Sequence, residues 1–147
     1  MIKLIVVGKM NHKYLNEGIS YYKKQLPVDL DIIEVKDEKN IEGMKLEGQY
    51  ILSKIKESDV VVVLAINGKI LDSIGFSKMI EDVNTYQQGD LVFVIGGSYG
   101  LSPEVYQRAN QKISFSKMTF PHQLMRLILV EQIYRGFMIM KNHPYHK

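Results

Sequence analysis

The chain has 147 residues, a length typical of one domain, and we expect residues 1–147 to form a single domain. Apolar residues make up 46% and charged residues 24%, a composition that argues against disorder. The absence of cysteine excludes a disulfide framework, a thiolate metal site and a cysteine nucleophile. No apolar run reaches the roughly 18 residues of a membrane span, and Ile2–Val7 lacks a signal-peptide cleavage site, so we expect a cytoplasmic protein without a membrane segment.

The net charge of +3 is unevenly distributed along the chain. Residues 1–75 hold 11 Lys or Arg and 11 Asp or Glu side chains. After Glu104, seven Lys or Arg side chains stand against the single acid Glu131, which gives residues 105–147 a net charge of +6. A basic segment on a neutral body indicates a polyanionic partner such as RNA, although a solvated or dimer-paired face explains the same pattern.

The first half of the chain alternates apolar runs of strand length with segments of helical spacing. Ile2–Val7 is almost continuously apolar, which is typical of a strand buried on both faces. Further strands are predicted over 30–35 and 60–66, and helices over 14–25 and 42–56. Two glycines, at 43 and 48, weaken the prediction of the second helix.

Asn67-Gly68 is a turn signal at the end of the strand predicted over 60–66. Asn-Gly favours a hairpin, but the apolar residues that follow, from Phe76 to Val83, have helical spacing. We therefore predict a loop from strand to helix at this point. The remaining elements are expected as a strand over 91–95, a short helix over 103–109, a short strand over 113–115 and a long helix over 122–141.

This order of elements predicts an α/β fold with a mostly parallel sheet flanked by helices. Ligands of such sheets bind beyond the carboxyl ends of the strands. The loops in which we expect a site are therefore 8–13, 64–69, 96–102 and 115–122.

The loop over 96–100 reads GGSYG and leads into a helix with Ser102 as its N-cap and Pro103 at its first position. Glycines allow backbone N–H groups to approach a ligand closely. The loop lacks the GxGxxG spacing and the downstream acid of a nicotinamide-binding Rossmann domain, and the chain has no Walker A motif. A ligand-binding loop and a tight strand-to-helix turn both remain open.

The segment 115–122 reads FSKMTFPH and lies between the short strand and the long helix. Its hydroxyl, thioether and aromatic side chains, together with free backbone groups, suit a small-molecule pocket that binds an adenine edge. The alternative is a loop whose apolar side chains complete the core.

The last predicted helix is apolar on most of its circumference. Of the 21 residues His122–Asn142, 12 are Leu, Met, Ile, Val, Phe or Tyr. Such a helix needs burial on several sides, so we expect a two-fold homodimer, with a central helix in a monomer as the alternative.

Polar residues near the C-terminus are candidates for contact with an anion. Arg135 follows Glu131 by four residues, so the two can pair along one helix face, or Arg135 can face a phosphate. The tail, Asn142–Lys147, combines an aromatic ring, imidazoles and a cation that suit a base and its phosphate, although tails often fray. No acid or thiol joins the tail histidines, so no metal site is expected.

Three segments carry a family resemblance: LVFVIGGSYGLSPEV, FSKMTFPHQLMRLILVEQIYRGFMIM and NHPYHK. With them the whole chain resembles the ribosomal RNA large-subunit methyltransferase H family of the SPOUT superfamily. The resemblance implies a deep trefoil knot in the C-terminal half of the α/β fold, and a homodimer. It also implies an S-adenosylmethionine-dependent enzyme that methylates N3 of a pseudouridine in 23S ribosomal RNA, in the subunit-interface stem-loop of the assembled 70S ribosome.

The resemblance assigns roles to particular residues. The cofactor pocket of the family maps onto eight positions: Leu64, Gly96, Phe115, Ser116, Lys117, Met118, Thr119 and Phe120. The residues that match RNA-binding and catalytic positions are Arg135, Tyr145, His146 and Lys147, and the tail of one protomer reaches the cofactor held by the other.

We expect catalysis by positioning and electrostatics, because Glu131 is the only carboxylate near the implied site. Arg135 and Lys147 then stabilise an imide anion or its phosphate, while Tyr145 and His146 hold the flipped base and His146 accepts its proton. His122 is a weaker candidate for the base. The alternatives are a related SPOUT methyltransferase for transfer RNA and a non-enzymatic, ribosome-associated binding protein.

Overall fold

The computed structural model describes residues 1–147 and contains one five-stranded parallel sheet in the order β2-β1-β4-β3-β5. The strands are β1 Ile2–Val7, β2 Leu30–Val35, β3 Val60–Ile70, β4 Leu91–Ile95 and β5 Gln111–Ser114. The helices are α1 Lys13–Lys23, α2 Met44–Ser53, α3 Ser73–Tyr86, α4 Pro103–Arg108 and α5 His122–Met140. This arrangement confirms the α/β fold class, and the deep trefoil knot stays a prediction.

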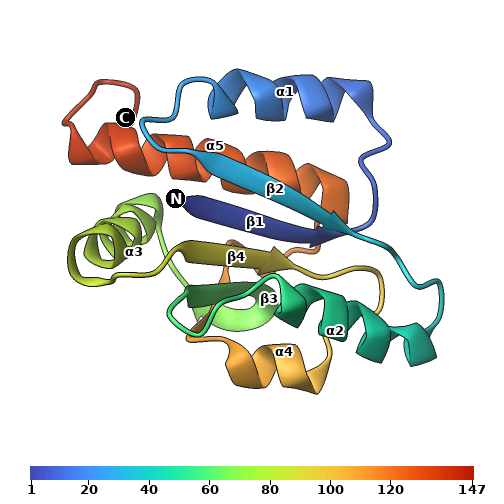
Figure 1. The fold of residues 1–147 in the computed structure, drawn as a ribbon. Coiled ribbons are helices and arrows are strands. Elements are labelled where there is room, and N and C mark those ends of the chain that lie inside the picture. Colours follow the sequence, from blue (N-terminus) through green and yellow to red (C-terminus); the bar gives the residue numbers. More distant parts are fainter.

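Helices cover both faces of the sheet (Figure 1). Alternating side chains of β1 divide between two cores, since Leu4 and Val6 pack with α1, α3 and α5, whereas Ile5 and Val7 pack with α2 and α4. Strands buried on both faces explain why β1 and β4 are apolar at nearly every position.

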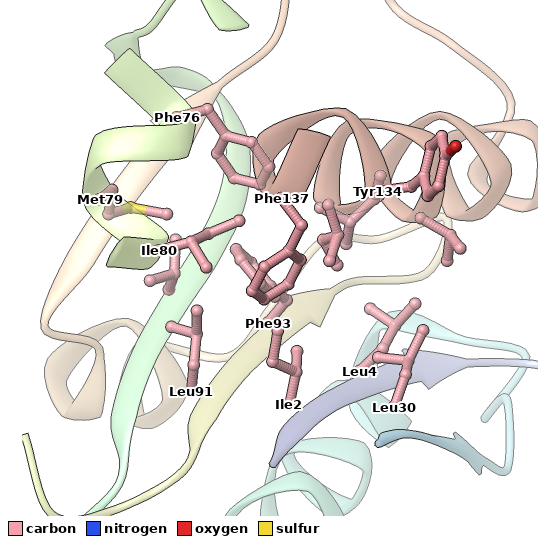
Figure 2. Close-up of a cluster of buried hydrophobic side chains, with 14 of the residues drawn as sticks. Ile2, Leu4, Leu30, Phe76, Met79, Ile80, Leu91, Phe93, Tyr134 and Phe137 are labelled. Carbon is pink, nitrogen blue, oxygen red and sulfur yellow. The ribbon is translucent and has the colours of Figure 1, made fainter. Parts of the chain in front are cut away.

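The larger core lies between the sheet and the helices α3 and α5 (Figure 2). Phe76 of α3 contacts Phe93 of β4 with ring centroids 5.6 Å apart, and Phe137 of α5 points into the same cluster. Phe76 is 2% exposed and Phe93 is fully buried. Burial of each such side chain stabilises the fold by about 1.5–3 kcal/mol.

The predicted end of β3 at Ile66 is wrong. The strand continues to Ile70 through a bulge, because both Leu64 and Lys69 are in register with Ile113 of β5 and the residues between them loop out. Gly68 makes this possible, since a Cβ there would lie 2.6 Å from the Ile113 carbonyl carbon. Asn67-Gly68 therefore shapes a bulge within a strand, and not a loop into a helix.

Other element boundaries differ by smaller amounts. A 3-10 turn, Ile41–Gly43, precedes α2 because the Asn40 side chain accepts a hydrogen bond from the Gly43 N–H at 2.7 Å. The helix predicted over 42–56 accordingly spans only Met44–Ser53. The short strand predicted over 113–115 is Gln111–Ser114, and the long helix ends at Met140 and not at 141.

Helix α5 lies against the sheet between α1 and α3. Ser77 of α3 donates a hydrogen bond to the Gly136 carbonyl at 2.7 Å, and Leu127 packs against Gly18 of α1. Three sides of the apolar circumference are thus covered within one protomer. None of the helices combines the length and the apolar character needed to cross a bilayer.

Candidate functional site

A cavity of about 390 Å³ opens at the carboxyl edge of the sheet, where sequence reasoning expected a site. Its volume is in the range of small-molecule sites, and more than half of its lining residues are hydrophobic. The cavity walls include seven of the eight residues implied for the cofactor: Leu64, Gly96, Phe115, Ser116, Met118, Thr119 and Phe120. Lys117 is exposed and does not line the cavity.

The glycine loop after β4 is both a tight turn and a wall of this cavity. The Gly100 N–H donates to the Gly97 carbonyl at 3.0 Å, and Gly100 has a φ of +81°, which favours glycine. Ser102 then caps α4, as predicted, with its Oγ 3.4 Å from the Val105 nitrogen. The two interpretations of this loop are therefore compatible.

The segment after β5 is held by local hydrogen bonds and by one aromatic contact. Ser114 Oγ donates to the Ser116 carbonyl at 2.8 Å, and Ser116 Oγ accepts from the Met118 N–H at 3.0 Å. The Phe115 ring meets Phe76 edge-on at 5.4 Å between centroids, so Phe115 also belongs to the core. The segment thus completes the core and lines the cavity at the same time.

Sequence reasoning missed five lining residues that lie outside the loops it selected: Ile95, Tyr106, Ile113, Ser114 and Met125. Tyr106 reaches the cavity from α4, and Met125 reaches it from the first turns of α5. Met125 follows His122, another lining residue, by three positions, so a common helix face was the available signal. Tyr106 had no such signal, because its approach depends on how α4 packs.

The implied catalytic residues gather at the other end of α5. Glu131 Oε1 accepts hydrogen bonds from Arg135 Nε at 2.8 Å and from the Tyr145 hydroxyl at 3.1 Å. Arg135 Nη1 lies 3.1 Å from His146 Nδ1, and its guanidinium carbon lies 4.6 Å from the centre of the Tyr145 ring. The structure thus brings Arg135, Tyr145 and His146 together, while Lys147 is exposed.

Tyr145 holds the tail against α5 and α1. Its ring meets Tyr134 edge-on at 4.8 Å between centroids, and its hydroxyl lies 3.5 Å from that of Tyr22. Burial raises the pKa of Tyr145 far above its ordinary value, and Tyr22 and the charge of Glu131 raise it further. Tyr145 is therefore a neutral hydrogen-bond donor at physiological pH.

The tail cluster and the cavity are well separated within one protomer. Arg135 lies ten residues beyond Met125 on α5, which corresponds to about 15 Å along the helix axis. The structure therefore does not bring the implied catalytic residues to the implied cofactor residues of the same chain.

Arg126 has a structural role that the sequence did not reveal. It is 2% exposed, and its Nη2 donates to the carbonyls of Val7 at 3.0 Å and Gly8 at 2.8 Å. Its Nη1 pairs with Glu34 at 3.2 Å, and its Nε has no partner. Burial lowers the pKa of Arg126 and Glu34 opposes this, but an arginine stays charged at physiological pH. Arg126 thereby joins α5 to the ends of β1 and β2.

Comparison with known sequences places the chain among methyltransferases. A family model described as "Predicted SPOUT methyltransferase" matches residues 1–146. The chain is 55% identical to a protein of Enterococcus faecalis (strain ATCC 700802 / V583) and 52% identical to one of Acholeplasma laidlawii (strain PG-8A), with 99% of each chain covered. Both are named "Ribosomal RNA large subunit methyltransferase H".

Solved structures with low sequence identity have the same fold. A probable methylase family protein from Haemophilus influenzae Rd KW20 matches with a TM-score of 0.59 at 9% identity, over 99% of this chain and 70% of its own. A ribosomal RNA small subunit methyltransferase E from Neisseria gonorrhoeae, bound to S-adenosyl methionine, matches with a TM-score of 0.53 at 14% identity, over 91% and 65%.

Proposed function

The chain belongs to the SPOUT methyltransferase family, among relatives named ribosomal RNA large subunit methyltransferase H, and from this premise we propose its reaction. It transfers a methyl group from S-adenosylmethionine to N3 of a pseudouridine in 23S ribosomal RNA, in the subunit-interface stem-loop of the assembled 70S ribosome. The observation that carries the proposal is the cavity of about 390 Å³ at the carboxyl edge of the sheet. The protein then works in the cytoplasm, with its ribosomal substrate.

The cavity suits the cofactor in its chemistry. S-adenosylmethionine supplies an electrophilic methyl group on a sulfonium. Apolar side chains such as Leu64 and Phe120 offer walls for a base, and Ser116 and Thr119 add hydroxyl groups. Gly96 adds no side chain to its wall, where a Cβ would approach Leu101 to 2.9 Å. The other residues assigned to the cofactor are Phe115, Met118 and Lys117, the last with an exposed side chain.

We propose a homodimer in which the two protomers contact each other through the side of α1 and α5 that faces away from the sheet. Tyr14 and Tyr21 are 68% and 62% exposed and share a side of α1 with Gly18, which contacts α5. The outward side of α5 continues this surface with half-buried residues, including Leu124, Ile128, Arg135 and Ile139. A two-fold axis here would cover the fourth side of α5 and bring the tail of one protomer toward the partner's cavity.

The attacking N3 carries a proton that must leave. If its pKa is about two units above pH 7, formation of the anion costs roughly 3 kcal/mol. Arg135 and Lys147 stabilise this anion or its phosphate, and Tyr145 and His146 hold the flipped base. A guanidinium only donates, so His146 Nδ1 accepts from Arg135 and Nε2–H is free to donate. Acceptance of the N3 proton by Nδ1 requires His146 to leave Arg135.

Methyl transfer to separate RNA substrates tests the proposal. The purified chain and tritiated S-adenosylmethionine are incubated with 70S ribosomes, naked 23S ribosomal RNA or transfer RNA. We expect label on one pseudouridine of the 70S particle and little on naked RNA, because the few cations of residues 105–147 give limited sequence-independent affinity and favour recognition of an assembled shape. Label on transfer RNA would favour a related SPOUT enzyme, and no binding of S-adenosylmethionine in calorimetry would favour a non-enzymatic protein.

A further inference from the structure

A second cavity, of about 540 Å³, lies at the carboxyl end of β1. It shares Gly97, Ser98 and His122 with the cofactor cavity, so the two are neighbours on one edge of the sheet. Tyr14 and Leu124 of the proposed dimer surface border it, and no step of the proposed reaction uses Lys9 or Asp37, which also line it. A ligand in it would sit beside whatever occupies the cofactor cavity.

The loop Gly8–His12 forms one wall of the second cavity, and its backbone is fixed by side chains of other elements. Arg126 donates to the Gly8 carbonyl, and Gln123 bonds both the Lys9 carbonyl at 3.1 Å and the Asn11 N–H at 2.8 Å. The Met10 N–H donates to Glu34 at 2.8 Å. A loop held at each of these residues is preorganised for binding.

Two side chains of this loop are accessible to a ligand, although the His12 ring also contacts Tyr14 at 5.6 Å between centroids. Lys9 and His12 line the cavity and are exposed, and neither forms an ion pair. Asp37, which follows β2, lines the same cavity, with Oδ1 3.9 Å from the position that a Cβ of Gly97 would take. A lysine and a carboxylate therefore share one cavity without pairing with each other.

We propose that the second cavity binds a ribonucleotide of the substrate strand adjacent to the target base, with Lys9 on its phosphate and Asp37 on its ribose 2′-hydroxyl. This inference rests on the proposed function and names the subsite beside the reacting base. The cation suits the anionic phosphate, the carboxylate accepts a hydrogen bond from the 2′-hydroxyl, and the volume suits a ligand of nucleotide size. Arg126 and Gln123 are positioning residues, because they hold the loop through hydrogen bonds to its backbone. Arg126 does not line the cavity, and Gln123 lines it without a charge.

Ribosome binding by charge variants tests this subsite. Co-sedimentation of the full chain with 70S ribosomes is measured over a salt series for Lys9→Gln, Lys9→Arg and the control Lys45→Gln. Lys45 is exposed on α2, which covers the face of the sheet opposite to α1 and α5. We expect Lys9→Gln to weaken binding about 3- to 10-fold and to lower the slope of log K against log salt by about 0.7–0.9, while the other two variants bind like the wild type.

A second variant separates the ribose contact from the phosphate contact. Asp37→Ala should weaken binding several-fold, because the lost hydrogen bond to the ribose outweighs the lost repulsion between the carboxylate and the RNA. The salt slope should not fall, since no phosphate contact is removed. Calorimetry should show unchanged affinity of every variant for S-adenosylmethionine.

The outcomes distinguish this inference from the proposed function. Wild-type affinity for ribosomes in Lys9→Gln would overturn the subsite even if methyl transfer is intact. Binding without methyl transfer in the wild type would overturn the proposed reaction, while a weaker Lys9→Gln would still support the RNA subsite. If Lys9→Gln sediments as a monomer, Lys9 belongs to the contact with the partner chain, and the inference is overturned. A wild-type chain that binds no ribosomes would also overturn it.

Discussion

Replacement of Arg126 by methionine tests whether a buried guanidinium holds the ends of β1 and β2 to α5. Arg126→Met removes charge-assisted hydrogen bonds to the carbonyls of Val7 and Gly8, each of which contributes about 1.5–3 kcal/mol. The variant also avoids the desolvation cost of the buried guanidinium, whose Nε has no partner. This offsets roughly 1–3 kcal/mol of the loss. Glu34 is partly exposed and regains water, so it adds little. The net loss of stability is about 3 kcal/mol, in line with other broken buried pairs.

Thermal unfolding at fixed protein concentration measures this loss. For a chain of this size, about 3 kcal/mol corresponds to a fall in Tm of roughly 6–12 °C. Arg126→Lys should recover part of the loss, since one ammonium reaches fewer of the three acceptors. Lys78→Met, which removes an exposed ion pair with Asp82, should leave Tm almost unchanged. An Arg126→Met chain as stable as the wild type would refute the reasoning.

Three other predictions concern separate parts of the molecule. Glu47 is buried, and burial raises the pKa of its carboxyl group, so ionisation of Glu47 destabilises the fold increasingly as pH rises above 4.5. In denaturant titrations, the stability of Glu47→Gln relative to the wild type should therefore increase between pH 4 and pH 7. A difference in stability that does not change with pH would contradict this. Gly68→Ala forces a Cβ against the backbone of Ile113, which should lower stability by about 1–3 kcal/mol; unchanged unfolding would disprove the close approach. Deletion of Tyr145–Lys147 should abolish methyl transfer, and Arg135→Ala should reduce turnover. Calorimetry should show that both variants bind the cofactor with nearly unchanged affinity. Full turnover in either variant would assign the altered residues a structural role.

The inner strands of the sheet were predictable because they are apolar on both faces. Ile2–Val7 and Leu91–Ile95 match the predicted ranges, since a continuous apolar run fits only the interior of a sheet covered by helices. The bulge in β3 was not predictable, because Asn67-Gly68 is a local turn signal and the pairing with Ile113 is a tertiary contact. Local patterns therefore located the strands but not the interruption within one.

The candidate site was predictable in its parts but not in their arrangement. Loop positions at the carboxyl edge identified most of the cavity wall. The spacing of Glu131 and Arg135 allowed two interpretations, and the structure has the ion pair between them, at 2.8 Å. No local pattern could show that Tyr145 packs beside that pair and away from its own cavity. The role of Arg126 was equally hidden, because it depends on where the carbonyls of β1 end.

Complementation between two inactive variants tests the composite site most directly. Ala65→Trp fills the cofactor cavity, and deletion of Tyr145–Lys147 removes the tail, so neither variant alone should methylate ribosomes. After random re-association, half of the dimers are mixed, and each mixed dimer has one intact cavity facing one intact tail. Our account therefore predicts that the mixture regains about one quarter of wild-type methyl transfer to 70S ribosomes. A mixture of confirmed mixed dimers that remains inactive would contradict an active site shared between two protomers.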